Sequence, residues 1–277
     1  MKFTTIAEAR KQTGLSYLGN INSSAKIIKN KKVSGQYTYI IYLAPATTSG
    51  YNVCSHSTPE CRLGCLATSG RAGMELSAGK TRTKDARIKK TKLFYEESSF
   101  FMAWLIAEIR FYQRKATKDG FYFSARLNGT SDIDWANVRV NGQNIFEIFP
   151  DVQFYDYTKN PNKFVNKPTN YHLTFSYTGR NWNSCETLLE RGNNIAMIFN
   201  VKNENELPAM YNGYKVINGD LTDYRVSDSK GIIVGLKFKH IANKVAEANV
   251  LNSCFVIKPA DVKCTPAGIN VRELQTA

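Results

Sequence analysis

Short apolar runs recur along this chain, and polar stretches with a helical pattern separate several of them. The runs lie at Gln36–Leu43, Phe121–Leu127, Val152–Tyr155, Tyr171–Phe175, Ile195–Phe199, Tyr214–Ile217, Gly231–Leu236 and Cys254–Ile257. Runs that are apolar throughout, rather than at alternate positions, are typical of strands that are buried on both faces. A chain that alternates such strands with helices is expected to form a parallel sheet with helices on both sides.

A count of about eight strands favours a parallel βα barrel of the TIM type. The barrel is expected to be partial or irregular, because several connections are short for a full helix. A doubly wound open sheet is the second possibility. In either case we expect a single α/β domain over residues 1–277, with residues 1–30 as an N-terminal cap.

A long helix is predicted over Leu93–Lys115, after a basic stretch that begins at residue 80. Phe101, Leu105 and Ile109 recur four residues apart within it, so that one face of the helix is apolar. Residues 80–115 are therefore expected to form a basic segment and a helix that packs on the sheet.

Polar side chains follow the predicted strands closely. In a parallel barrel the carboxyl ends of all strands lie on one face, where active sites are found. We expect a pocket on that face. The catalytic candidates are Arg126, Asp132, Asp156, Lys159 and Asp220, and the cofactor-binding candidates are Asn128 and Ser176. The alternative is that these positions are polar only because they belong to loops.

Three of the six cysteines lie close together in a loop at residues 44–70, directly after the first predicted strand. Their spacing is Cys54-x6-Cys61-x3-Cys65, and thiolates in such groups bind iron–sulfur clusters or zinc. Three ligands would leave one iron of a four-iron cluster free for a substrate or cofactor. Gly64 lets the backbone come close to a sulfide. We therefore expect an iron–sulfur cluster of the 4Fe–4S type on these three cysteines.

Two other interpretations of the cysteine loop stay open. One is a zinc ion with His56 as its fourth ligand, and the other is a set of ordinary thiols. Cys185 lies near a predicted helix start, where the pKa of a thiol is lowered, and is a candidate for a fourth cluster ligand. Cys254 lies in an apolar run and is expected to pack in the core.

The charge of the chain points to an anionic partner. Lysine and arginine number 37 and aspartate and glutamate 23, which gives a net charge of +14 and favours contact with nucleic acid or phosphate-bearing metabolites. The nucleic-acid candidates are Arg71, Lys84, Arg87, Lys89 and Lys90. Cations at a helix start oppose the helix dipole, and a bound anion would offset this cost. The alternative is a solvated helix start without a specific partner.

The start of the chain, MKFTTIAEARKQTG, is polar and has no apolar signal core. No stretch reaches the ~18 apolar residues that a membrane helix needs. We therefore expect no membrane contact and a cytoplasmic location, where cysteines stay reduced and available to a metal.

Five segments carry a resemblance to a known family. They are the cysteine loop with CLATSGRAG, Arg126–Trp135, Phe154–Pro161, Leu173–Gly179 and Val216–Lys239. Together they resemble an uncharacterised bacteriophage family, typified by mycobacteriophage gene product eighty-eight, over roughly residues 35–258. The resemblance implies a phage context, with the host cell cytoplasm as the location, and it brings no established activity.

A looser resemblance is to radical S-adenosylmethionine (SAM) enzymes. These place a three-cysteine loop after the first strand of a partial or complete βα barrel, and the open iron binds the amino and carboxylate groups of SAM. Their usual spacing, C-x3-C-x2-C, is shorter than the one here. The glycine-glycine-acidic motif that they have after the second strand is missing here, and Asn128–Asp132 is only a distant stand-in for it. The resemblance implies SAM as a second cofactor.

The sequence thus predicts a phage iron–sulfur protein with a radical-SAM-like barrel that acts on a nucleotide or nucleic acid. The alternative is a non-catalytic nucleic-acid-binding protein, in which the iron–sulfur or zinc site is structural or senses redox state. Nothing in the sequence indicates an oligomeric state.

Overall fold

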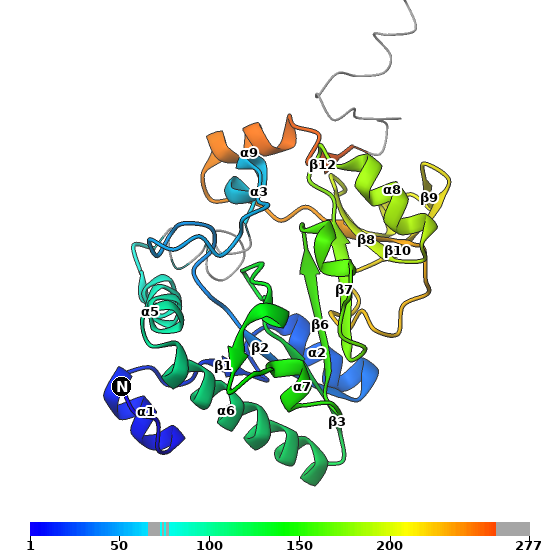
Figure 1. The fold of residues 1–277 in the computed structure, drawn as a ribbon. Helices are drawn as coiled ribbons and strands as arrows, with labels where there is room; N and C mark the ends of the chain where they lie inside the picture. Colours follow the sequence, from blue (N-terminus) through cyan, green and yellow to red (C-terminus); the bar gives the residue numbers. More distant parts are fainter. Residues whose placement is uncertain (66–72, 74, 76–77, 259–277) are drawn as a thin grey trace, which may run out of the picture.

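The computed structural model describes residues 1–258 except 66–72, 74 and 76–77. Arg71, one of the predicted nucleic-acid contacts, and Cys264 lie outside the described residues. Within the described part, one large sheet has helices packed on both of its faces (Figure 1).

The sheet has ten strands, and those from β2 to β10 in its spatial order run parallel to one another. In spatial order the main path is β1 (Gly19–Asn20), β2 (Gln36–Ile41), β3 (Tyr122–Arg126), β6 (Gln153–Thr158), β7 (Tyr171–Ser176), β8 (Asn194–Phe199), β11 (Ile233–Lys237), β10 (Tyr214–Asn218) and β9 (Met210–Tyr211). The two short outer strands, β1 and β9, are antiparallel to their neighbours. β12 (Val256–Ile257) pairs with β8, and a separate hairpin joins β4 (Arg139–Val140) to β5 (Gln143–Asn144).

The prediction of a βα barrel is wrong, because the described sheet is open and ends in β1 on one side and β9 on the other. Each of these antiparallel strands occupies an edge that a barrel would need for closure. The cysteine loop does not follow the first strand either. It follows β2, and β1 precedes β2 in the chain. The fold is a mixed α/β arrangement around a mostly parallel sheet.

The helices of the described chain lie before, between and after the strands. They are α1 (Ile6–Thr13), α2 (Ala25–Ser34), α3 (Pro59–Leu63), α5 (Arg82–Glu96), α6 (Ser98–Lys118), α7 (Ile145–Ile148), α8 (Trp182–Glu190) and α9 (Lys244–Leu251), with 3-10 turns η1 (Trp135–Asn137), η2 (Pro161–Phe164) and η3 (Glu204–Glu206). None of the helices in this part of the chain has the length and apolar character needed to cross a membrane.

Helices α6 and α2 cover opposite faces of β2. The Tyr39 hydroxyl donates to Glu108 Oε2 of α6 at 2.6 Å. The next residue back, Thr38, accepts from Asn30 Nδ2 of α2 at 3.1 Å. Because successive side chains of a strand point to opposite faces, these two contacts place the helices on the two sides of the sheet. The predicted N-terminal cap of residues 1–30 therefore includes part of the cover of one face.

The predicted helix over Leu93–Lys115 is two helices, since α5 ends at Glu96 and α6 starts at Ser98. Glu97 between them has φ −132° and ψ 49°, which lies outside the helical range. The expected apolar face of α6 is buried at Phe101, Leu105 and Ile109. The apolar pattern thus marks the packing face of α6 but does not reveal the break.

The core is divided into three clusters. The largest lies under α6, between it and β2, β3 and β6. A second lies between α8 and β7, β8 and β11. A small third cluster joins α9 to Phe255, Val256 and the half-buried Cys61 of α3. This third cluster fastens the cysteine loop to the C-terminal part of the sheet.

Candidate functional site

Neighbouring strands separate at their carboxyl ends. β3 pairs with β6 only through Ser124 and Ala125, so that Arg126 lies beyond the pairing. β7 pairs with β8 as far as Ala196, and β12 then takes over the same edge of β8 from Ile198. These separations give side chains room at the carboxyl ends of the strands, which is where open parallel sheets bind ligands.

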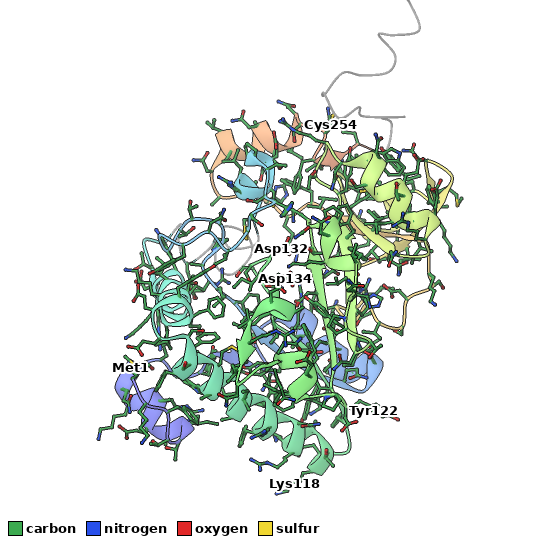
Figure 2. All side chains as sticks on the ribbon, viewed as in Figure 1. Met1, Lys118, Tyr122, Asp132, Asp134 and Cys254 are labelled. Atoms are coloured by element: carbon green, nitrogen blue, oxygen red, sulfur yellow. The ribbon has the colours of Figure 1, made fainter. Side chains whose placement is uncertain are left out.

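A cavity of about 240 Å³ lies at this end of the sheet, and Cys54, Cys61 and Cys65 all line it. We call it the cysteine pocket. Six of the strand-end residues chosen from the sequence also line it: Arg126, Asn128, Asp132, Lys159, Ser176 and Asp220. Figure 2 shows Asp132 toward the middle of the molecule, below α3 and α9 in this view. The structure therefore brings the cysteine loop and the strand ends to one cavity.

Cys54 lies in the loop after β2 and is held by backbone groups. Its Sγ accepts from Ala46 N at 3.5 Å and faces Thr130 O at 3.8 Å. Burial raises the pKa of the Cys54 thiol to about 11, against the opposing effect of the Ala46 N–H. Because metals bind the thiolate, ionisation of Cys54 near neutral pH requires a strong positive charge close to its sulfur.

Cys61 lies in α3, whose first turn is capped by Thr58. Cys61 N donates to Thr58 Oγ1 at 3.2 Å. The Lys159 side chain reaches Cys61 from the end of β6. Burial opposes the charge on Lys159, but a hydrogen bond to Cys61 and the charges near it raise the pKa of this ammonium overall. A lysine thus stands beside two of the three cysteines.

Asp132 is fully engaged in hydrogen bonds. Lys163 Nζ lies 2.6 Å from Asp132 Oδ1, and Thr158 Oγ1 donates to the same oxygen at 2.7 Å. Lys159 N donates to Asp132 Oδ2 at 2.8 Å. These contacts fix the loop after β3 against the end of β6. No local sequence signal marks Lys163, because it lies in a connection between strands.

Asp156 does not line the cysteine pocket, unlike the other strand-end candidates. It is 2% exposed, and it accepts from Asn128 N at 2.8 Å and from the Tyr171 hydroxyl at 3.0 Å. Burial raises the pKa of Asp156 to about 7, although Arg126 and the Asn128 N–H act in the opposite direction. Asp156 supports the wall of the pocket from behind.

Arg126 and Asp220 each have a charged partner that the sequence did not reveal. Arg126 Nη1 lies 2.9 Å from Asp223 Oδ2, and Lys26 Nζ lies 2.6 Å from Asp220 Oδ1. Although burial acts in the other direction, Lys26 lowers the pKa of the Asp220 carboxyl. Asp223 comes from the segment after β10, and Lys26 comes from α2.

The described nucleic-acid candidates do not form one surface. Lys84 and Lys89 are exposed on the outer side of α5, whereas Arg87 is half-buried and Lys90 is 7% exposed. Lys90 Nζ donates to the backbone oxygen of Leu18 at 2.7 Å. Arg87 and Lys90 instead line a second cavity.

Among the described residues, no three side chains of Cys, His, Asp and Glu are grouped closely enough to hold a single metal ion. His56 is exposed, and its Nδ1 lies 2.9 Å from Ser55 Oγ. His56, Cys185 and Cys254 do not line the cysteine pocket. The pocket thus gathers three thiols around a space without a preformed single-ion site.

Comparison with known proteins identifies a family for this chain but no individual relative. No curated protein and no solved structure is significantly similar to this chain. A family model described as gene product 88 matches residues 15–256, which is most of the chain. The match confirms the phage family predicted from the motifs, while the resemblance to radical SAM enzymes stays a prediction. The chain belongs to the gene product 88 family.

Proposed function

We propose that the cysteine pocket holds an iron–sulfur cluster on Cys54, Cys61 and Cys65, and that the protein uses it in redox chemistry on a nucleotide or nucleic acid. The observation that carries this proposal is the single cavity shared by the three thiols and the ends of the parallel strands. The cavity has about 240 Å³ of open space beyond the side chains that line it.

The arrangement of the three thiols around one cavity, without a single-ion site among the described residues, supports a cluster over zinc. Tetrahedral zinc binds sulfur at about 2.3 Å, which requires its ligands to gather tightly around one point. In a four-iron cluster each cysteine binds a different iron, so that the sulfurs surround a larger body. Three thiols around a cavity suit the second arrangement better. The exposed position of His56 also weakens the zinc interpretation.

The charges around the pocket support the same choice. A cluster with three thiolates has a net negative charge, and Lys26, Arg126, Lys159, Lys237 and Lys239 line the cavity beside them. Asp132, Asp220 and Asp223 offset part of this positive charge. Arg126 is buried and Lys26, Lys159 and Lys237 are half-buried, so this excess of cations is costly without an anion, and the cluster would supply one.

When bound, such a cluster supplies single electrons and one iron that is open to the amino and carboxylate groups of SAM. The residues of the chain would position the ligands around it. Asn128 and Asp132 are held rigidly by hydrogen bonds, so that they keep a fixed polar edge. Tyr177, Leu236 and Phe255 form an apolar wall that limits the access of water. Ser176 adds a hydroxyl next to this wall.

Anaerobic purification tests the proposal directly. The expected product is brown, has iron and acid-labile sulfide in equal amounts, and shows a broad visible absorption band. Cys54→Ser, Cys61→Ser and Cys65→Ser should each lower the iron content strongly. Cys254→Ser is the matched control, because Cys254 is also half-buried but lies outside the pocket. A colourless protein with one zinc per chain would overturn the proposal.

A second candidate function is non-catalytic binding of nucleic acid, with a structural or redox-sensing cluster. It is supported by the exposed Lys84, Lys89 and Lys92 on α5 and by the net charge of +14. Binding would then depend steeply on salt and would not change with SAM. Lys84→Gln with Lys89→Gln should weaken binding to all sequences alike. Formation of 5′-deoxyadenosine by the reduced protein would favour the first function instead.

A further inference from the structure

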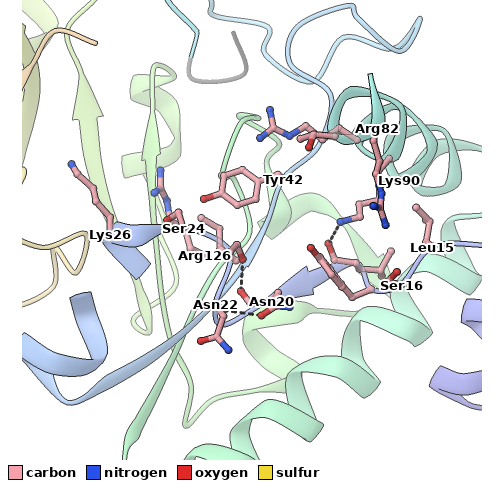
Figure 3. A pocket seen from close by; sticks show the side chains of 18 of the residues that line it. Leu15, Ser16, Asn20, Asn22, Ser24, Lys26, Tyr42, Arg82, Lys90 and Arg126 are labelled. Carbon is pink, nitrogen blue, oxygen red and sulfur yellow. Dashed lines mark hydrogen bonds between the residues drawn. The ribbon is translucent and has the colours of Figure 1, made fainter. Parts of the chain in front are cut away.

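A second cavity, which we call the basic cavity, lies next to the cysteine pocket and has a volume of about 620 Å³. Its walls come from the segment before α2, the first turn of α2, the amino-terminal half of α5, and the ends of β2 and β3. Figure 3 shows Tyr42 between Arg82 and Lys90 on one side and Lys26 and Arg126 on the other. The volume lies within the range of small-ligand sites, about 300–1,000 Å³.

The lining of the basic cavity is strongly cationic. Its basic residues are Lys26, Arg82, Arg87, Lys90, Arg126 and Lys239. Only Glu75 and Asp223 provide carboxylates among the described lining residues. Asp223 is occupied by Arg126 at 2.9 Å. Positive charge therefore exceeds negative charge in a space that is partly closed to water.

Three of these cations are held at a cost. Burial lowers the pKa of Lys90 to about 8, and the charge of Arg87 adds to this effect, although the Glu108 carboxylate acts in the opposite direction. Burial also lowers the pKa of Arg87. Lys239 is exposed as a residue, but partial burial of its ammonium, together with Lys26 and Arg126, lowers its pKa against the opposing charges of Asp220 and Asp223. Each group would be more stable in its charged form if an anion entered the cavity.

The Nε–H group of Arg126 has no acceptor within the described part of the chain. The Arg126 side chain is buried, with 8% of the residue exposed, and it lines both the basic cavity and the cysteine pocket. The nearest Asp156 oxygen lies 3.8 Å from this Nε atom. An unpaired guanidinium N–H at this depth is costly, while the guanidinium as a whole adds positive charge to the wall of both cavities.

The start of α2 adds neutral donors to the same wall. Ser23, Ser24 and Ala25 line the cavity, and Ser24 caps the helix by accepting from Ile27 N at 3.4 Å. The first turn of α2 contains no acidic residue. The amino end of a helix favours phosphate because its free N–H groups and its dipole both attract anions.

We propose that the basic cavity binds a phosphomonoester of nucleotide size, with the phosphate between Arg126, Lys239 and the start of α2. Tyr42 provides a half-buried aromatic ring inside the same cavity, and Arg87 covers it with its Cζ 5.1 Å from the ring centre. Such a ring suits a planar base. A phosphomonoester combines the charge and the flat group that these walls fit.

The two cavities share one wall, formed by Lys26, Arg126, Gly129, Asp223 and Lys239. A ligand in the basic cavity would therefore lie next to the cysteine pocket. In this respect the inference extends the proposed function, because it names the group that the substrate carries. It does not depend on the cluster, since the cations belong to α2, α5, β3 and the segment after β11.

Calorimetric titration of the full chain with adenosine 5′-monophosphate, adenosine and inorganic phosphate tests the proposal. We expect the monophosphate to bind, inorganic phosphate to compete with it, and adenosine to bind at least roughly tenfold more weakly, as for the loss of a charged hydrogen-bonding group. Arg87→Gln and Lys239→Gln should each weaken the binding of the monophosphate roughly tenfold. Lys202→Gln, at an exposed lysine that does not line the basic cavity, should leave it unchanged.

Two further binding measurements distinguish a phosphate site from the cluster, and a mononucleotide ligand from the end of an oligonucleotide. The triple variant Cys54→Ser, Cys61→Ser, Cys65→Ser should keep its affinity for the monophosphate. Loss of the cluster and loss of the phosphate site can then be distinguished.

A 5′-phosphorylated oligonucleotide should bind more tightly than its 5′-hydroxyl form if the phosphate belongs to a chain end. The proposal is overturned if neither phosphate nor the monophosphate binds. Equal binding of both oligonucleotides without mononucleotide binding would also overturn it. Circular dichroism melting confirms that each variant is folded.

Discussion

Arg126 Nη1 donates to both carboxylate oxygens of Asp223, at 3.1 Å and 2.9 Å, across 97 residues of sequence. Both residues are buried, and both line the basic cavity and the cysteine pocket. The ion pair is therefore part of the wall between the two cavities. It also fastens the segment after β10 to the end of β3, on the opposite half of the sheet.

Asp223→Asn should destabilise the protein by about 3 kcal/mol, because loss of one partner leaves the buried Arg126 charge without compensation. Urea unfolding followed by circular dichroism measures the change in the free energy of unfolding. Asp151→Asn, at an exposed position, is the control and should change it little. A loss below about 1 kcal/mol would mean that water or Asp156 already compensates Arg126.

Asp156 and His172 should give opposite pH dependences of stability. The folded pKa of Asp156 is raised by burial from 3.8 to about 7, so the folded state binds more protons than the unfolded state in that interval. Its contribution to stability is therefore lost as the pH rises from about 4 to about 7. Burial lowers the pKa of His172 from 6.5 to about 4, so its contribution is lost as the pH falls through this range.

Unfolding free energies of the wild type, Asp156→Asn and His172→Asn, measured at intervals of pH, separate the two effects. Relative to the wild type, Asp156→Asn should gain stability toward pH 7, and His172→Asn should gain stability toward pH 4. Parallel profiles for all three proteins would contradict the assignment of these two groups.

Gly129→Ala should distort the wall between the cavities. An added Cβ at Gly129 would lie 2.5 Å from Ile41 O and 2.8 Å from Tyr42 Cδ1. We expect a loss of about 2 kcal/mol or more from overpacking against the β2 backbone, with a lower melting temperature. Gly120→Ala is a useful comparison: its Cβ would meet nothing within 4 Å, and only its φ of +75° should cost about 1 kcal/mol. Equal losses for the two variants would argue against the steric reason.

Lys159→Met should lower the reduction potential of the proposed cluster. A positive charge beside Cys61 stabilises the more negative, reduced form, and its removal takes this stabilisation away. A redox titration followed by electron paramagnetic resonance measures the shift, with Lys202→Met as the exposed control. An unchanged potential would place Lys159 out of electrostatic contact with the cluster.

The positions of the main strands were predictable because a strand that is buried on both faces needs apolar residues at successive positions, and such runs are visible in the sequence. The run Tyr171–Phe175 lies within β7, and Ile195–Phe199 lies within β8. The break at Glu97 was not predictable, since the apolar pattern of α6 is compatible with a helix that starts earlier. Lys26 was missed for a similar reason: α2 has a weak apolar pattern and was assigned to a cap.

The sequence by itself determined which segments become strands, which three thiols belong to one loop, and which family the chain belongs to. Each of these follows from residues that are close together in the chain. Only the tertiary structure decided that the sheet stays open, because strand pairing at its edges joins residues that are distant in sequence. The same holds for the pairing of Arg126 with Asp223 and of Lys26 with Asp220, and hence for the wall between the two cavities. Contacts between distant segments depend on the whole fold, and no local pattern encodes them.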